Sequence, residues 1–261
     1  MRLMTLVVIM IMTSITSAQH DGHGQPALTK EEPPTTQRKL PYKSGWPKPV
    51  MDDMKVSYFE FENLEWFREG AGAALRWDAI GWNGGPKQRT WFKSTGEQSF
   101  SGNDLGKFDL QFLNGYLVAP TIDFVYGLRY DVRNGSVKTR GQASAVVGFQ
   151  GFLPYRFNVE GSLFISDEGK FAARLTGSYQ MQLTQELYLV PRAELNLAAS
   201  RSTRMGIEPG IFESEFGLRL RYEIRRELAP YIGYVWTNSK NSSIGNGGSL
   251  GAWVLGLRMW F

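Results

Sequence analysis

The sequence predicts an all-β fold, an antiparallel transmembrane β-barrel of roughly twelve strands with a disordered N-terminal periplasmic tail. Three observations predict it. Beyond the first twenty residues, no apolar run approaches the ~20 residues that a membrane-spanning helix needs. Most of the chain instead alternates polar and apolar residues over segments of ~9–11 residues, long enough to cross a bilayer as tilted strands. Aromatic residues make up 13% of the chain, as in barrels that place rings at both membrane interfaces.

Residues 1–18 have the features of a secretory signal peptide. Arg2 supplies a positive start, residues 3–12 are apolar, and Thr16-Ser17-Ala18 places a small residue at the expected cleavage point. The apolar stretch is shorter than a membrane-spanning helix requires, so we expect a cleaved signal rather than an N-terminal anchor.

Residues 19–54 form a polar segment that proline interrupts repeatedly. Six prolines between Pro26 and Pro49 leave no room for a helix or a strand ladder, so we expect a flexible periplasmic tail. The tail contains both histidines of the protein, His20 and His23. It ends with Met51 and Met54, at the entrance to the folded part.

Residues 55–261 are predicted to form the barrel, and their clearest strand spans residues 212–225. Side chains alternate along a strand with a period of two, so one face of this strand is apolar and the other is charged. The apolar face comprises Phe212, Phe216, Leu218, Leu220, Tyr222 and Ile224. The charged face comprises Glu213, Glu215, Arg219, Arg221, Glu223 and Arg225. One such strand could cover a soluble β-sandwich, but several in series favour a barrel.

The same alternation predicts about twelve strands, an even number as in bacterial single-chain barrels, with ten as the alternative. They are expected near residues 55–67, 72–82, 88–97, 106–117, 121–132, 141–152, 155–166, 170–182, 186–198, 211–225, 228–237 and 250–261. Short connections are assigned to the periplasm, around residues 84–87, 119–121, 154, 184–185 and 227. The longest connections, residues 199–210 and 238–249, are assigned to the cell exterior, which is the asymmetry of outer-membrane barrels.

The C-terminus adds an independent signal for the outer membrane. Trp253, Leu255, Leu257 and Met259 alternate along the last predicted strand, and the chain ends on Phe261. This pattern resembles the C-terminal sorting signal of outer-membrane barrels. We therefore expect the protein to face outer-membrane lipid.

Charged residues on the polar faces of the strands should point into the lumen. The predicted lumen charges are Arg76, Asp78, Lys93, Glu97, Asp123, Arg129, Asp131, Glu160, Arg174, Arg192, Glu194, Glu213, Glu215, Arg219, Arg221, Glu223, Arg225 and Arg258. Our first interpretation is structural: opposite charges pair across neighbouring strands and hold the wall rigid. In the functional alternative, the acidic members guide a cation through a narrow pore, and Glu213 and Glu215 near the outer rim meet it first.

A series of motifs resembles the copper resistance protein B family of outer-membrane proteins. The matching stretches are residues 81–85, 91–97, 127–131, 148–155, 183–187, 191–192, 217–227 and 229–231. They cover nearly the whole predicted barrel in the family's order. The resemblance implies an outer-membrane location, copper binding, and a part in moving or sequestering copper. Many family members carry a long tail rich in Met and His, whereas this tail offers few such residues, which argues against high-capacity copper storage.

Copper as a bound or transported ion would need ligands, and the chain has no cysteine. Copper(II) prefers imidazole and carboxylate, which makes His20 and His23 candidates, while copper(I) prefers thioethers, which makes Met51 and Met54 candidates. The alternatives are that the two histidines bind nothing specific and that the two methionines make ordinary apolar contacts. A periplasmic copper-binding protein is a further conceivable partner of the tail.

Three other functions are weighed against copper handling. Outer-membrane phospholipases and proteases use a histidine base within the barrel, and this chain has no histidine after His23, so we do not expect an enzyme. A general small-solute porin or a purely structural barrel remains open, because both produce the same alternation. The net charge of +4 is too small to indicate nucleic-acid binding.

Overall fold

The computed structural model describes residues 55–69, 72–100, 106–134, 139–240 and 248–261. The predicted signal peptide and tail, with His20, His23, Met51 and Met54, lie outside the described residues. No helix in the described part of the chain is long and apolar enough to cross a membrane.

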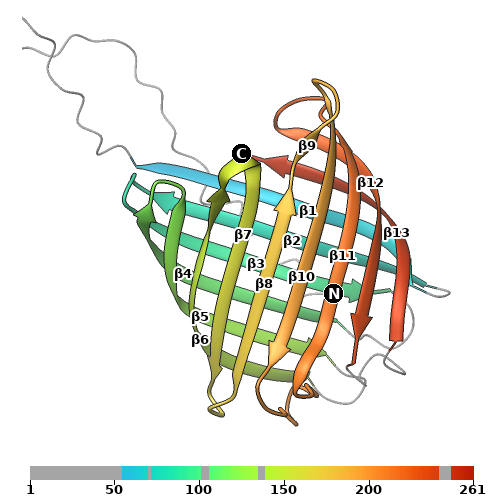
Figure 1. Cartoon of the computed structure of the whole chain (residues 1–261). Coiled ribbons are helices and arrows are strands. Elements are labelled where there is room, and N and C mark those ends of the chain that lie inside the picture. The colour runs from blue at the N-terminus through green and yellow to red at the C-terminus, as the bar shows by residue number, and fades with distance from the viewer. Residues whose placement is uncertain (1–54, 70–71, 101–105, 135–138, 241–247) are drawn as a thin grey trace, which may run out of the picture. The chain divides into compact units, whose positions relative to one another are not determined.

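The described residues form a series of antiparallel strands (Figure 1). The strands are β1 (Val56–Glu69), β2 (Gly72–Gly84), β3 (Gln88–Ser99), β4 (Lys107–Ala119), β5 (Ile122–Asn134), β6 (Thr139–Leu153), β7 (Phe157–Ser166), β8 (Phe171–Tyr179), β9 (Met181–Gln182), β10 (Leu187–Ala198), β11 (Gly210–Tyr222), β12 (Leu228–Ser239) and β13 (Gly248–Trp260). A short 3-10 turn, η1 (Pro154–Arg156), joins β6 to β7.

The sheet closes on itself because β1 pairs with β13 as well as with β2. Each strand otherwise pairs with its sequence neighbours, except that the two-residue β9 continues β8 beyond Gln180 and pairs with β10. Counting β8 and β9 as one strand gives twelve, so the predicted closed antiparallel barrel and its strand number are confirmed. In Figure 1 the blue β1 and the red β13 lie beside each other.

The two ends of the barrel differ in the length of their connections. We call the end where β1 begins and β13 ends the terminal rim, and the opposite end the loop rim. Turns at the terminal rim are short, such as residues 85–87 and 120–121, whereas residues 199–209 and 240–247 connect strands at the loop rim. In outer-membrane barrels short turns face the periplasm, so the lengths of the connections agree with the prediction that the terminal rim faces the periplasm.

Alternation along the strands separates a lipid face from a lumen face. On β5, Phe124, Tyr126, Leu128 and Tyr130 are between 39% and 68% exposed, whereas Asp123 is 6% exposed. The apolar exterior matches the predicted lipid-facing side.

Phe212 corrects one prediction. The alternation placed it with Phe216 on the lipid face, but it is 8% exposed and lines the lumen. The cause is a bulge in β11: Asn196 pairs with Glu213 and Leu197 pairs with Ile211, which leaves Phe212 without a partner on β10. An extra residue in one strand shifts the alternation by one position, and the apolar pattern alone did not reveal it.

The lumen face also carries apolar side chains, which form two buried clusters. One comprises Trp91, Leu113, Val125, Val146 and Phe164. The other comprises Phe67, Ala74, Tyr231, Val235 and Val254. These residues fill part of the interior, so the lumen is a packed core with charged layers rather than an empty tube.

Candidate functional site

The lumen contains a cavity of about 230 Å3 that is the candidate functional site. Nine carboxylates and nine cationic side chains line it, so its formal charge balances to zero. The walls come from β1 to β8, β10 and β11, and residues 200–207 contribute from the loop rim.

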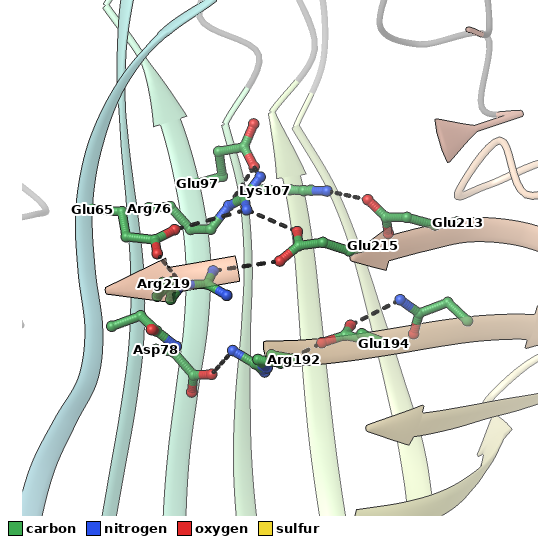
Figure 2. Close-up of polar contacts among 12 residues, drawn as sticks. Glu65, Arg76, Asp78, Glu97, Lys107, Arg192, Glu194, Glu213, Glu215 and Arg219 are labelled. Atoms are coloured by element: carbon green, nitrogen blue, oxygen red, sulfur yellow. Dashed lines mark hydrogen bonds and ion pairs between the residues drawn. The ribbon is translucent and has the colours of Figure 1, made fainter. Parts of the chain in front are cut away.

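Arg76 on β2 is the centre of one ionic cluster (Figure 2). Its guanidinium donates to Glu97 on β3 at 3.0 Å and to Glu215 on β11 at 2.8 Å, and Glu65 lies 3.9 Å away. The planar guanidinium has five donors in a fixed geometry, which suits it to contact several carboxylates at once.

A second cluster runs through the middle of the lumen. Arg192 contacts Asp78 at 3.1 Å and Glu194 at 3.3 Å, and Glu194 also lies 3.4 Å from Arg174. Arg174 in turn reaches Asp109 at 3.3 Å, a carboxylate that Arg129 also contacts. Arg129 lies 4.4 Å from the centre of the Phe164 ring, so a cation–π contact anchors it as well.

Many of these ion pairs reach across the lumen. Six of them join strands that have at least two other strands between them on the barrel wall. The widest is Lys107 on β4 with Glu213 on β11, at 2.6 Å, between strands on opposite sides of the barrel. Lys93 on β3 reaches Glu160 on β7 at 2.7 Å. The ion pairs therefore close the lumen from wall to wall, beyond the pairing of neighbouring strands that the sequence suggested.

The most deeply buried pair is Glu65 with Arg219. Their side chains are 0% and 5% exposed, and Nε of Arg219 donates to Oε1 of Glu65 at 2.6 Å. The hydroxyl of Tyr231 lies 3.2 Å from the same oxygen. Strands β1 and β11 are thereby tied together inside the barrel, although two strands separate them on the wall.

The connection between β10 and β11, residues 199–209, roofs the cavity at the loop rim. Ser202 and Met205 are only 4% and 3% exposed, although they lie in the longest described connection. The backbone oxygen of Met205 accepts a hydrogen bond from Arg133, and that of Arg204 accepts one from Arg140. The Arg204 side chain pairs with Asp167 and Glu168, and its hydrogen bond to Asp167 raises the pKa of Arg204. We call residues 199–209 the lid.

The structure places most of the predicted lumen charges in these networks. Glu213 and Glu215 lie in the part of β11 nearer the loop rim, and Arg258 pairs with Glu60 close to the terminal rim. Arg221 contacts Glu223, which follows the end of β11. Arg225 departs from the prediction: β11 ends at Tyr222, so Arg225 lies exposed in the turn rather than on a lumen face.

Several lumen residues were missed by sequence reasoning. Asp109 occupies a charged position on β4, where polar and apolar residues alternate clearly, so the pattern itself could have found it. Glu65 could not be found by strict alternation, because a bulge in β1 between Phe61 and Leu64 moves it onto the lumen face that Glu60 occupies. Met205 could not be found this way, because it lies in a connection and a period-two pattern says nothing about a loop that folds inward.

No group of three or more His, Asp or Glu side chains within the described ranges is arranged to hold a metal ion. The predicted metal ligands His20, His23, Met51 and Met54 lie outside those ranges.

Comparison with known proteins identifies relatives of the chain. Residues 55–261 match the family described as copper resistance protein B precursor (CopB). A copper resistance protein B homolog from Pseudomonas syringae pv. tomato is 36% identical over 237 residues, covering 88% of this chain and 79% of the relative. Copper resistance protein B of Escherichia coli is 34% identical over 282 residues, covering 95% of this chain and 92% of that protein.

Among solved structures, the NanC porin has a similar fold. It superimposes with a TM-score of 0.51 at 10% identity, over 78% of this chain and 99% of the porin. Similarity at this identity concerns the fold alone. A closed antiparallel barrel with an apolar exterior places this protein in the outer membrane. The family model matches the whole barrel, and the two relatives are about 35% identical to this chain. The chain therefore belongs to the copper resistance protein B family.

Proposed function

We propose that this protein is a non-enzymatic outer-membrane component of copper resistance that binds copper and passes it across the outer membrane. Membership of the copper resistance protein B family is the observation that carries the proposal. The lumen supports a narrow, selective path over general diffusion, because cross-lumen ion pairs such as Lys107–Glu213 leave no wide channel.

The lumen carboxylates are the groups that would meet a cation. Glu213 and Glu215 lie near the loop-rim end of β11, the strand that follows the lid, so they are among the first acidic side chains below the loop rim. Each is neutralised by a basic partner, Glu213 by Lys107 and Glu215 by Arg76. Copper can therefore enter only by replacing or displacing these protein cations, which makes passage dependent on specific binding.

The tail supplies the other proposed ligands. His20 and His23 would bind copper(II), and Met51 and Met54 would bind copper(I), according to the preferences of imidazole and thioether. Because the tail leads into β1 at the terminal rim, we propose that it meets copper, or a periplasmic copper-binding protein, on the periplasmic side.

Two measurements test the proposal. Cells that produce the protein should tolerate more copper than cells that lack it, and their copper content should change in one direction, either net uptake or net efflux. Copper titration of the purified mature protein should show saturable binding, which should weaken in a variant that lacks residues 19–54 and in the His20→Ala/His23→Ala variant. Absence of saturable binding by the mature protein would leave only the role of a porin or a structural barrel.

A further inference from the structure

Strand register places six oxygen-bearing side chains in one continuous row on the lumen wall. Successive residues of the row are direct cross-strand partners on β5, β6, β7, β8, β10 and β11. Direct partners in antiparallel strands project from the same face about 5 Å apart. We call these residues the oxygen row: Asp123, Gln150, Glu160, Thr176, Glu194 and Glu215. The row itself contains no basic residue.

The oxygen row rises through the barrel. Asp123 follows the first residue of β5 at the terminal rim, whereas Glu215 lies in the half of β11 nearer the loop rim. The rise follows from the tilt and stagger of strands in a closed barrel, which carry a row of paired residues obliquely along the wall. The row therefore connects the cavity below the lid with the periplasmic end of the lumen.

A protein cation holds every carboxylate of the row. Arg89 lies 3.0 Å from Asp123, and Lys93 lies 2.7 Å from Glu160. Glu194 is held by Arg174 and Arg192, and Glu215 by Arg76 and Arg219. Of these cations, only Lys93 is a lysine, and its ammonium pairs with a single carboxylate.

Oxygen atoms without hydrogen-bond partners lie beside this lysine pair. Gln150, directly opposite Glu160, and Ser162, two residues along β7 on the same face, are 7% and 4% exposed. Neither Oε1 of Gln150 nor Oγ of Ser162 has a hydrogen-bond partner among the described residues. The Lys93 ammonium also makes no well-aligned hydrogen bond, despite its short distance to Glu160. Buried polar atoms normally have hydrogen-bond partners. These unsatisfied oxygens are therefore available to bind a polar or charged ligand.

We propose that Glu160, with Gln150 and Ser162, forms a divalent-cation site on the oxygen row, and that the ammonium of Lys93 occupies it until a cation displaces it. The inference rests on the proposed function and deepens it by naming the ion. Carboxylate, amide and hydroxyl oxygens suit copper(II) and not copper(I), so copper passes this point as Cu2+. Lysine is a compact point charge on a flexible stem, and it can leave a carboxylate more readily than a bidentate arginine can.

The experiment compares two lysine variants of the full-length mature protein in detergent and in liposomes. Lys93→Met removes the displaceable ammonium and keeps the chain length. Lys107→Met removes the equivalent charge from the Lys107–Glu213 pair, which has a similar N–O distance but no unsatisfied oxygen beside it. Retained heat-modifiable migration on gels and a β-rich circular dichroism spectrum show that both variants fold.

Lys93→Met should bind Cu2+ about tenfold more tightly than the wild type, with an electron paramagnetic resonance signal of oxygen coordination. Lys107→Met should gain much less, because it exposes the Glu213 carboxylate without the unsatisfied amide and hydroxyl oxygens that lie beside Glu160. The added substitution Glu160→Gln should remove the gain, and Gln150→Leu should reduce it. Equal Cu2+ binding by the two lysine variants would overturn the site, as would a gain that survives Glu160→Gln.

Failure of the proposed function gives a different result. If the wild-type protein confers no copper tolerance, the role in copper passage falls whatever the variants bind. If tolerance is present and Lys93→Met gains no Cu2+ binding, only the displaceable-lysine site falls.

Discussion

The buried Glu65–Arg219 pair yields the sharpest prediction about what holds this barrel together. The two side chains are 0% and 5% exposed, and Arg219 approaches Glu65 to 2.6 Å. Arg219→Met leaves the Glu65 carboxylate with only Arg76 at 3.9 Å and the Tyr231 hydroxyl at 3.2 Å. Removing one partner of a buried ion pair typically costs about 3–5 kcal/mol, because the remaining charge stays desolvated. We expect a loss of this size in the free energy of unfolding for Arg219→Met.

The chain offers a matched control at the loop rim. Arg201 and Glu208 approach to the same 2.6 Å, but their side chains are 67% and 42% exposed. Exposed pairs contribute at most about 1 kcal/mol, so Arg201→Met should change stability little. Both pairs join Arg to Glu at the same distance, so burial is the main difference between them, and the additional contact of Arg219 with Glu215 is weaker, at 3.6 Å.

The measurement is reversible guanidinium unfolding of the protein in phospholipid vesicles, followed by tryptophan fluorescence. The double variant Glu65→Leu/Arg219→Met should be less destabilised than the two single losses added together, because it leaves no unpaired charge. If Arg219→Met costs no more than Arg201→Met, the lumen pairs do not stabilise the barrel through burial and the reasoning is wrong.

Three further predictions follow from local geometry. A Cβ at Gly96 would lie 2.2 Å from the Trp77 ring, whereas one at Gly177 would meet nothing within 4 Å. Gly96→Ala should therefore lower the free energy of unfolding by about 1–3 kcal/mol, and Gly177→Ala should leave it unchanged. Equal effects of the two substitutions would show that the Trp77 ring does not restrict position 96. Phe164→Leu removes the ring that Arg129 and Arg174 face, and it should destabilise the barrel by about 1–2 kcal/mol in the same assay. Phe149→Leu on the lipid face, where no such cation lies, should have a smaller effect. Arg204→Gln breaks the ion pairs with Asp167 and Glu168, so a glutamate-specific protease should cleave the lid after Glu208 faster than in the wild type. Arg226→Gln on the terminal rim is the control. Equal cleavage rates in the two variants would show that the ion pairs of Arg204 do not hold the lid in place.

The strand pattern was readable from sequence because it depends on local alternation. On β5, Phe124, Tyr126 and Leu128 face lipid while Asp123 faces the lumen, and a period of two is all that this division needs. The same argument failed at Phe212, where one bulged residue reversed the alternation, and at Arg225, where the strand ended before the apolar pattern did. Bulges and strand ends depend on the partner strand, which the sequence of one strand does not specify.

The sequence by itself determined most of the strand side chains that enter the lumen, but not which of them meet. Glu65 and Arg219 are 154 residues apart in the chain, and Lys107 and Glu213 are 106 apart. Their contacts arise only when the sheet closes with a particular stagger between its strands. That stagger sets the position of each residue along the barrel axis, and so it decides which side chains face each other across the lumen. The oxygen row depends on the same stagger, since it joins residues of six strands through register alone. Alternation is a property of each strand, whereas the charge pairing and the cavity below the lid are properties of the closed barrel.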